Sequence, residues 1–308
     1  MKKESSAMSQ VLSNPILKSA KSENIRPRTL RLPRLPKSLR DPFFVFSVLA
    51  LLTVFAMALL ADPLYPGDPL DMVPDPFLWP GDDLMFPLGT DSLGRDLTAG
   101  IIHGSRASLL VGFSSAVLGL LIGTTVGSIA GYFGGWIEDV LVRITEIFQT
   151  IPTMLLIIVI LAIGDTSLNL IALSIGLASW PMIARLARAE FKSLREADFV
   201  MAARGLGYGT PRIIVSEILP NALPTLIVAA SVLVANGILL ESAVSFLNLG
   251  DPNVVSWGSL IGAGRTQIRT EWYLSALPGI AIVLTVLSLN IVGDRLTDIL
   301  NPKSRERT

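Results

Sequence analysis

Long apolar runs alternate along this chain with polar segments rich in glycine and proline. A helix that crosses a membrane needs about 20 mostly apolar residues. Six segments fit this pattern: about 43–61, 107–130, 150–164 with an amphipathic lead-in from 136, 168–185, 222–246 and 277–293. Single apolar runs of this length also occur as buried helices of soluble proteins. Six in one chain indicate an all-α membrane protein with six transmembrane helices.

Charge distribution sets the predicted orientation of these helices. Only 16% of the residues are charged, whereas soluble proteins carry about 25%. If the N-terminus is inside, six spans return the C-terminus to the same side, and 21 of the 25 Lys and Arg residues then lie there. Cytoplasmic segments carry such an excess of Lys and Arg. Both termini are therefore predicted to be cytoplasmic.

This orientation divides the chain into segments. A basic cytoplasmic tail (1–42), a first transmembrane helix (43–61) and an external loop (62–106) precede a five-helix core (107–297), which contains a cytoplasmic loop (189–220), and a cytoplasmic tail (298–308). The N-terminal tail lacks the early apolar region and cleavage site of a signal peptide. A basic tail beside a span usually fixes orientation or contacts anionic lipid, so we expect a lipid membrane and no nucleic acid as its partner.

Four glycines in the second apolar run are spaced by four residues: Gly119, Gly123, Gly127 and Gly131. On a helix they lie close to one face. Small residues on a transmembrane helix allow a second helix to approach closely. We therefore predict a helix-packing face, either within this chain or with a second one.

Pro152 interrupts the third apolar run, and Glu241 is the one carboxylate in the fifth. Broken helices at membrane depth occur where protein or a water-filled cavity covers them. Intramembrane acids are candidates for function. Both residues are candidates for a transport pathway or gate, although a packed kink at Pro152 and a packing role for Glu241 fit equally well.

Other chemistry finds little support in the sequence. Cysteine is absent and His103 is the single histidine, so no metal site is predicted, and no hydrolase motif is present. The segment 258–266 has the wrong glycine spacing for a phosphate loop, so we expect no ATP site, no cofactor and no catalytic residue. Ionisable groups do not line the spans, which argues against an ion-coupled transporter.

The segment from Glu196 to Asn221 predicts two short helices joined by a tight turn. Phe199, Ala202, Ala203 and Leu206 share one helical face at spacings i, i+3, i+4 and i+7, and Gly207 is a natural helix stop. Thr210 and Pro211 fit the start of a second helix that ends before Pro220. A DNA-binding helix-turn-helix needs a third helix and free access to a groove. A helical knob for a cytoplasmic partner fits better between two spans.

The stretch "MAARGLGYGTPRIIVSEILPN" resembles the coupling loop of ABC-importer permeases, with Ala202, Ala203, Gly207, Leu219 and Pro220 in register. In that family the loop docks into a cleft of an ATPase subunit. The resemblance thus assigns the coupling loop to seven residues: Phe199, Met201, Ala202, Ala203, Gly207, Leu219 and Pro220. Met201 stands where glutamate is usual, and Glu217 stands where this branch often has histidine.

Further motifs are similar to the C-type subunit of the dipeptide/oligopeptide/nickel permeases. They are "FPLGTDSLGRDLTAGIIHGSRASL", "SAVSFLNLG", "SWGSLI" and "LNIVGDRLTDILNP", and the resemblance covers about residues 38–302. Phe86 replaces a usual histidine, and Asn301 replaces a usual aspartate.

This resemblance implies a type I ABC permease fold in the bacterial inner membrane. It also implies a B-type permease as heterodimer partner, two ATP-binding subunits and an external solute-binding protein. The chain would transport di- or oligopeptides without catalysis of its own. Nickel, a metal chelate or an opine remains the alternative substrate, and an ion-coupled secondary transporter, a membrane scaffold and an intramembrane enzyme are the rival functions.

Overall fold

A computed structural model of the chain describes residues 41–73 and 75–300. The described residues all belong to one compact unit. Nearly all of the predicted basic tail, residues 1–40, lies outside the described residues, as do residues 301–308 of the predicted C-tail.

Helices make up almost all of the ordered secondary structure in the described residues. Two isolated β-bridges, Met72 with Arg95 and Thr90 with Asp96, are the extended pairings found there. The elements are α3 (Pro42–Leu59), α4 (Ala61–Leu64), α5 (Leu97–Phe133), α6 (Gly135–Thr150), α7 (Thr153–Ile163), α8 (Leu168–Arg195), α9 (Asp198–Gly205), α10 (Thr210–Arg212), the π-helix η2 (Ile213–Ile218), α11 (Leu219–Phe246), α12 (Trp257–Gly264), the 3₁₀ turn η3 (Arg265–Gln267) and α13 (Tyr273–Leu300).

Five of these helices are long and apolar enough to cross a membrane: α3, α5, α8, α13 and the continuous helix Thr210–Phe246. The pair α6 and α7 passes the same test together, but its two helices meet at 82°. The predicted count of six holds if this bent pair is one span. The third span is therefore broken beside Pro152, where the sequence placed an interruption.

The helices extend beyond their apolar runs. α5 begins at Leu97 rather than near residue 107, because the Asp96 carboxylate accepts a hydrogen bond from the Thr98 amide at 2.7 Å and caps the helix. The helix therefore extends into polar sequence, where the hydropathy of the residues does not reveal that they are helical. α5 thus includes residues 97–106, which were assigned to the external loop from the sequence.

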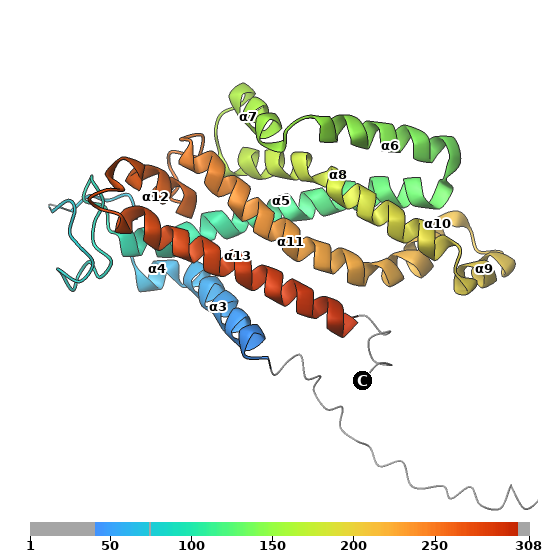
Figure 1. The fold of residues 1–308 in the computed structure, drawn as a ribbon, viewed down its shortest axis with the longest axis horizontal. Coiled ribbons are helices and arrows are strands. Elements are labelled where there is room, and N and C mark those ends of the chain that lie inside the picture. Colours follow the sequence, from blue (N-terminus) through green and yellow to red (C-terminus); the bar gives the residue numbers. More distant parts are fainter. Residues whose placement is uncertain (1–40, 74, 301–308) are drawn as a thin grey trace, which may run out of the picture. The chain divides into compact units, whose positions relative to one another are not determined.

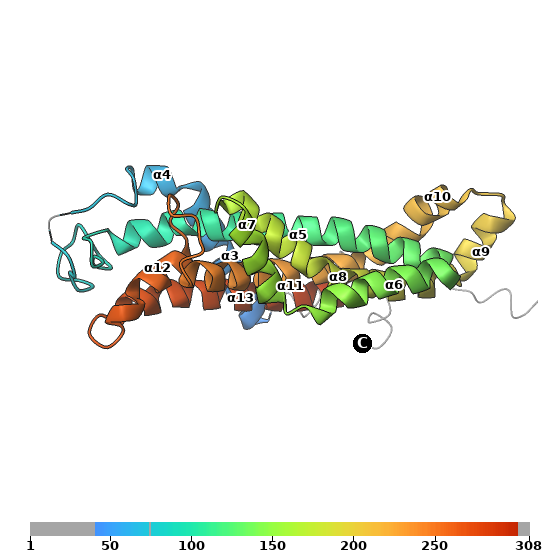
Figure 2. The same cartoon turned by 90° about the horizontal axis from the view of Figure 1, so that it is seen from above.

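The long helices pack in a definite order. α3 lies against α13, α13 against α11, and α11 against both α5 and α8, while α6 and α7 each contact α8. Figure 1 shows α3 and α13 on one side of this arrangement and α6 and α7 on the other. The loop with α9 and α10 lies at one end of the long helices, and α12 lies at the opposite end (Figure 2).

The four glycines at four-residue spacing form the contact of α5 with α8, within this chain. A Cβ at Gly123 would lie 2.6 Å from the Cβ of Ile183 and 2.7 Å from the Trp180 carbonyl oxygen. At Gly131 the nearest atoms would be the Arg188 carbonyl oxygen at 2.5 Å and the Phe191 Cβ at 2.9 Å. Because the four glycines have no side chains, the backbones of α5 and α8 can lie close together.

The outward faces of the spans carry large exposed apolar side chains. On α3, Phe43, Phe46, Leu49 and Leu52 are each more than half exposed. Exposed apolar area of this extent is unusual for a soluble monomer. It fits a surface covered by lipid or by another transmembrane chain.

The polar segment between α4 and α5 is held on the ends of α5 and α13. The Tyr273 hydroxyl donates to the Leu78 carbonyl oxygen at 2.9 Å, and the Asp91 carboxylate accepts from the Arg95 amide at 2.8 Å. His103 contacts the Tyr65 carbonyl oxygen through Nε2 at 2.9 Å. The single histidine therefore has a local structural partner.

The glycine contact leads to a stability prediction. Gly123→Ala places a methyl group against backbone and β-carbon atoms that cannot move away cheaply, so the free energy of unfolding should fall by about 1–3 kcal/mol. Gly119→Ala is the matched control, because its Cβ would have 3.6 Å to its nearest neighbours. Thermal unfolding in detergent measures both variants. Equal transition temperatures would contradict the packing role of Gly123.

Candidate functional site

The loop between α8 and α11 contains a short helix that ends in a glycine turn. α9 ends at Gly205, and Gly207 has φ +80°. The Gly207 amide donates to the Arg204 carbonyl at 2.9 Å, and the Tyr208 amide donates to the Ala203 carbonyl at 3.1 Å. These two bonds form a Schellman motif, which favours glycine at the left-handed position. The helix stop thus lies where the sequence predicted it.

Side chains of this loop divide between an inner and an outer face. Val200 and Ala203 are buried in the same apolar cluster as Phe191 of α8 and Leu226 of α11. Outward lie Phe199, Met201 and Leu206, exposed by 38%, 53% and 74%. Ala202 is also exposed. Ala203 therefore does not share the outer face with Phe199, Ala202 and Leu206, as the helical spacing suggested.

The second part of the loop differs from the sequence prediction. It does not end before Pro220: α10 continues through the π-helix η2 into α11, and Pro220 lies in the first turn of α11. The wider π turn accommodates a residue that has no amide to donate, and the Asn221 side chain donates to the Glu217 carbonyl at 2.7 Å. Thr210 is the first residue of α10 and makes no side-chain cap.

This continuity makes the second part of the loop, from Thr210 to Ile218, part of the same long helix as α11. Ile213 and Ile218 of η2 are buried in the cluster that holds Val200 and Ala203. Leu219, which the sequence assigned to the coupling loop, packs partly buried against this cluster. α9 and α11 are therefore joined by side chains that pack in one apolar cluster.

A cavity of about 540 Å³ lies at the bend between α6 and α7, beside α8 and α11. Its polar lining consists of Gln149, Thr153, Ser179, Arg185 and Asn236, and its apolar lining includes Phe148, Ile151, Pro181 and Met182. Pro152 itself is exposed at the break, and its two neighbours line the cavity. The break therefore shapes the cavity wall.

The lining of this cavity has one basic group, Arg185, and no Asp or Glu. Asn236 places an amide in the middle of an apolar helix. A polar group at such a depth needs a polar partner or water. The arrangement can hold a polar solute by hydrogen bonds and can attract an anionic group.

Glu241 lies elsewhere, at the junction of α5, α11 and α12. It is fully buried, and its carboxylate accepts hydrogen bonds from Ser245 at 2.7 Å and from Ser108 at 3.3 Å. The Ser108 hydroxyl oxygen also accepts from the Trp257 amide at 3.3 Å. Glu241 does not line the cavity. This placement favours its packing alternative, since the carboxylate joins three helices.

Comparison with known proteins places this fold in a family. The family described as "binding-protein-dependent transport system inner membrane component" matches residues 123–306. The chain belongs to this family. It is an inner-membrane permease subunit of an ABC importer, with an all-α membrane fold and a transport role.

Named relatives of the permease are transport proteins for small peptides. It is 37% identical to the di/tripeptide transport system permease protein DppC of Pseudomonas aeruginosa over 262 residues, 83% of this chain and 86% of the relative. It is 40% identical to the dipeptide transport system permease protein DppC of Alkalihalophilus pseudofirmus over 218 residues, 70% of this chain and 72% of the relative. The glutathione transport system permease protein GsiD of Pectobacterium atrosepticum is 32% identical over 283 residues, 91% of this chain and 94% of the relative.

A solved structure supports the type of fold. A chain of the MetNI methionine ABC transporter in an inward-facing conformation superposes with a TM-score of 0.55 at 20% identity. The match covers 66% of this chain and 96% of that chain. The permease therefore has the type I ABC permease fold that its motifs implied.

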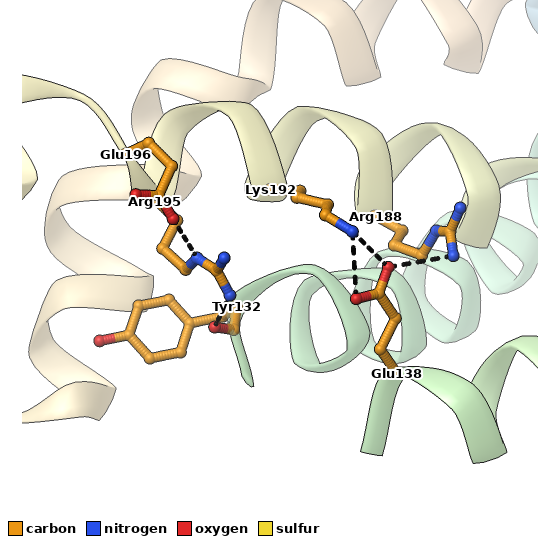
Figure 3. A network of polar contacts seen from close by, with 6 residues as sticks. All are labelled: Tyr132, Glu138, Arg188, Lys192, Arg195 and Glu196. Atoms are coloured by element: carbon orange, nitrogen blue, oxygen red, sulfur yellow. Dashed lines mark hydrogen bonds and ion pairs between the residues drawn. The ribbon is translucent and has the colours of Figure 1, made fainter. Parts of the chain in front are cut away.

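Several residues of the site were missed by sequence reasoning. Arg185 and Asn236 line the cavity, and Glu138 on α6 binds two basic residues of α8 (Figure 3). An asparagine within an otherwise apolar span was a usable signal for Asn236. No sequence signal pairs Glu138 with α8, because the partners are about fifty positions apart.

The Glu241 junction generates a second stability prediction. Glu241→Leu removes the acceptor of Ser108 and Ser245 and should lower the free energy of unfolding by about 1–3 kcal/mol. Glu241→Gln keeps an acceptor oxygen at the same place and should retain most of the stability. Thermal unfolding in detergent separates the two. A Leu variant as stable as the Gln variant would show that these hydrogen bonds contribute little.

Proposed function

We propose that this permease imports di- or oligopeptides, driven by ATP hydrolysis in separate partner subunits. The loop from Asp198 to Ile218 receives the motion of those subunits on the cytoplasmic side. Movement of α8 and α11 then changes which side of the membrane the cavity opens to. This is alternating access between two states that differ in which face is sealed.

One observation carries the coupling part of the proposal. Exposed apolar side chains on α9 lie directly over buried ones that belong to the core of the spans. Phe199, Met201 and Leu206 offer an apolar surface of the kind that a groove on another protein buries. Val200 and Ala203, on the opposite face of α9, belong to the cluster shared by α8 and α11. A displacement of the outer face of α9 can thus reach α8 and α11, which line the cavity, through directly packed side chains.

The cavity lining supports peptide as the substrate class. A peptide carries amide groups and a terminal carboxylate, for which Asn236, Gln149 and Arg185 supply hydrogen bonds and charge. The relatives named for dipeptide, di/tripeptide and glutathione transport point the same way. The lining holds no Asp, Glu, His or Cys, the residues that a metal pathway needs.

The proposed assembly contains a B-type permease, two ATP-binding subunits and an external solute-binding protein. The excess of Lys and Arg on one side supports cytoplasmic termini and a cytoplasmic coupling loop. A second permease chain would complete the pathway beside the broken helix α6–α7. The solute-binding protein would deliver peptide at the opposite side, where α12 lies.

Transport in proteoliposomes tests the proposal. The permease with its partner subunits and binding protein should take up labelled di- and oligopeptides only with ATP. Gly207→Pro should abolish this uptake, because proline cannot adopt φ +80° and has no amide to donate to Arg204. ATP hydrolysis and peptide uptake are measured on the same vesicles.

Gly205→Ala is the control, since Gly205 is exposed in the same turn, has no positive φ and has open space around a Cβ. It should transport like the unmodified permease. Uptake driven by an ion gradient without ATP would overturn the proposal. Hydrolysis stimulated by the binding protein without movement of any peptide would overturn the substrate class alone.

A further inference from the structure

Helix α6 has little apolar attachment to the rest of the permease. Thr145 is the one buried residue among its sixteen, and Trp136, Val140 and Ile147 are all exposed. It follows α5 through two glycines with positive φ, Gly134 at 68° and Gly135 at 55°. Such a corner offers little resistance to a change of angle. The ring of Phe148 contacts that of Trp180 on α8, at 5.2 Å between centroids, but this contact lies in the last turn of α6, so another contact must hold its first turns.

An ion-pair cluster provides that contact. Glu138 on α6 accepts hydrogen bonds from Arg188 at 3.1 Å and from Lys192 at 2.9 and 3.2 Å. Its side chain is 12% exposed, while those of Arg188 and Lys192 are 35% and 53% exposed, so water reaches the cluster mainly from the side of the basic residues. Figure 3 shows one carboxylate between the two basic side chains of α8. The donors are one helical turn apart, so Glu138 fixes the position of α6 along α8.

The same stretch of α8 holds the α5–α6 corner and leads into the coupling loop. Arg195 donates to the Tyr132 carbonyl oxygen at 3.1 Å, at the end of α5. The Tyr132 ring lies under the Arg204 guanidinium of α9, at 5.5 Å. α9 begins three residues after Arg195. The last two turns of α8 therefore contact α6, α5 and the loop together.

The far end of α6 reaches the cavity. α6 has sixteen residues, so it is about 24 Å long at about 1.5 Å per residue. Phe148 and Gln149 in its last turn line the cavity, as do Ile151 and Thr153 on either side of Pro152. One helix thus connects the ion-pair cluster near the coupling loop to the cavity wall.

We propose that Glu138 is a positioning residue for transport: it fastens α6 to α8, so that motion received by the coupling loop moves the cavity wall at the α6–α7 break. Without this fastening, α6 keeps its Phe148–Trp180 contact with α8 in its last turn, but its first turns can turn about Gly134 and Gly135. ATP is then hydrolysed without an equal movement of substrate. The proposal rests on the coupling role given above to the loop from Asp198 to Ile218.

Glu138→Gln tests this in the complete transporter, since it keeps the shape of the side chain and removes its charge. The measured quantity is the number of peptide molecules imported per ATP hydrolysed. It should fall by about fivefold or more, because energetic coupling between two sites typically changes an equilibrium by about fivefold at the least. Stimulated ATP hydrolysis should persist. If Glu138 were needed only for assembly, its substitution would reduce the amount of assembled transporter, and the rates of peptide import and of ATP hydrolysis would fall together.

Spin-label distances give a readout that does not depend on transport. The chain has no cysteine, so Asp139→Cys on α6 and Ser193→Cys on α8 provide two exposed labelling positions. With Glu138 present, the distance between the labels should stay the same with and without a non-hydrolysable ATP analogue. With Glu138→Gln, it should broaden or change between the two states.

Glu146→Gln is the matched control, because Glu146 lies on the same helix but pairs with Arg143 three residues before it, in solvent. It should leave coupling and distances unchanged. If Glu138→Gln assembles poorly, the charge exchange Glu138→Lys with Lys192→Glu should restore both assembly and coupling, provided that Arg188→Gln removes the second cation that would repel the new lysine. Failure of the exchange to restore coupling in an assembled transporter would overturn the proposal.

Unchanged coupling and unchanged distances in Glu138→Gln would also overturn it. This outcome differs from failure of the proposed function. If Gly207→Pro still transports, the coupling loop is wrongly assigned. If Gly207→Pro is uncoupled and Glu138→Gln is not, only the role of Glu138 is wrong.

Discussion

Close approach of the α5 and α8 backbones is the constraint on which the rest of the structure depends. Inside a bilayer, apolar side chains gain nothing by leaving lipid for protein, so van der Waals contact has to hold helices together. At Gly123 and Gly131, the absence of a side chain brings the α8 backbone within contact of α5. This contact fixes α8, and α8 then positions both the coupling loop and the cavity.

Helix α8 serves as the central element of the functional site. Its middle lines the cavity with Ser179 and Pro181, and its last turns bind Glu138. Beyond Arg195 the chain enters α9 directly. A single helix therefore touches the surface proposed to meet the ATPase, the ion-pair cluster and the solute pathway. In the proposed function, this arrangement lets a distant hydrolysis step act on the cavity without a chain of ionisable groups through the membrane.

The broken helix α6–α7 complements this rigid element. Its 82° bend opens a polar cavity in a helix set that is otherwise apolar. Freed backbone groups at such a break are tolerated because a cavity, rather than lipid, lies beside them. Helix α6 has one buried residue, and its aromatic contact with α8 lies in its last turn, so polar contacts hold its first turns. Electrostatic contacts are directional, so they can hold α6 in register where apolar packing is sparse.

The sequence by itself determined the helical spans, the glycine face, the break at Pro152 and the helix stop at Gly207. Each depends on local rules: span length in lipid, side-chain size and backbone φ. Tertiary structure decided the rest. It showed that the glycines meet α8 of the same chain and that Ala203 faces inward. It also showed that Pro220 lies inside a continuous helix, because a π turn can absorb a missing amide. The pairing of Glu138 with α8 depends on how distant segments pack, which no local pattern encodes.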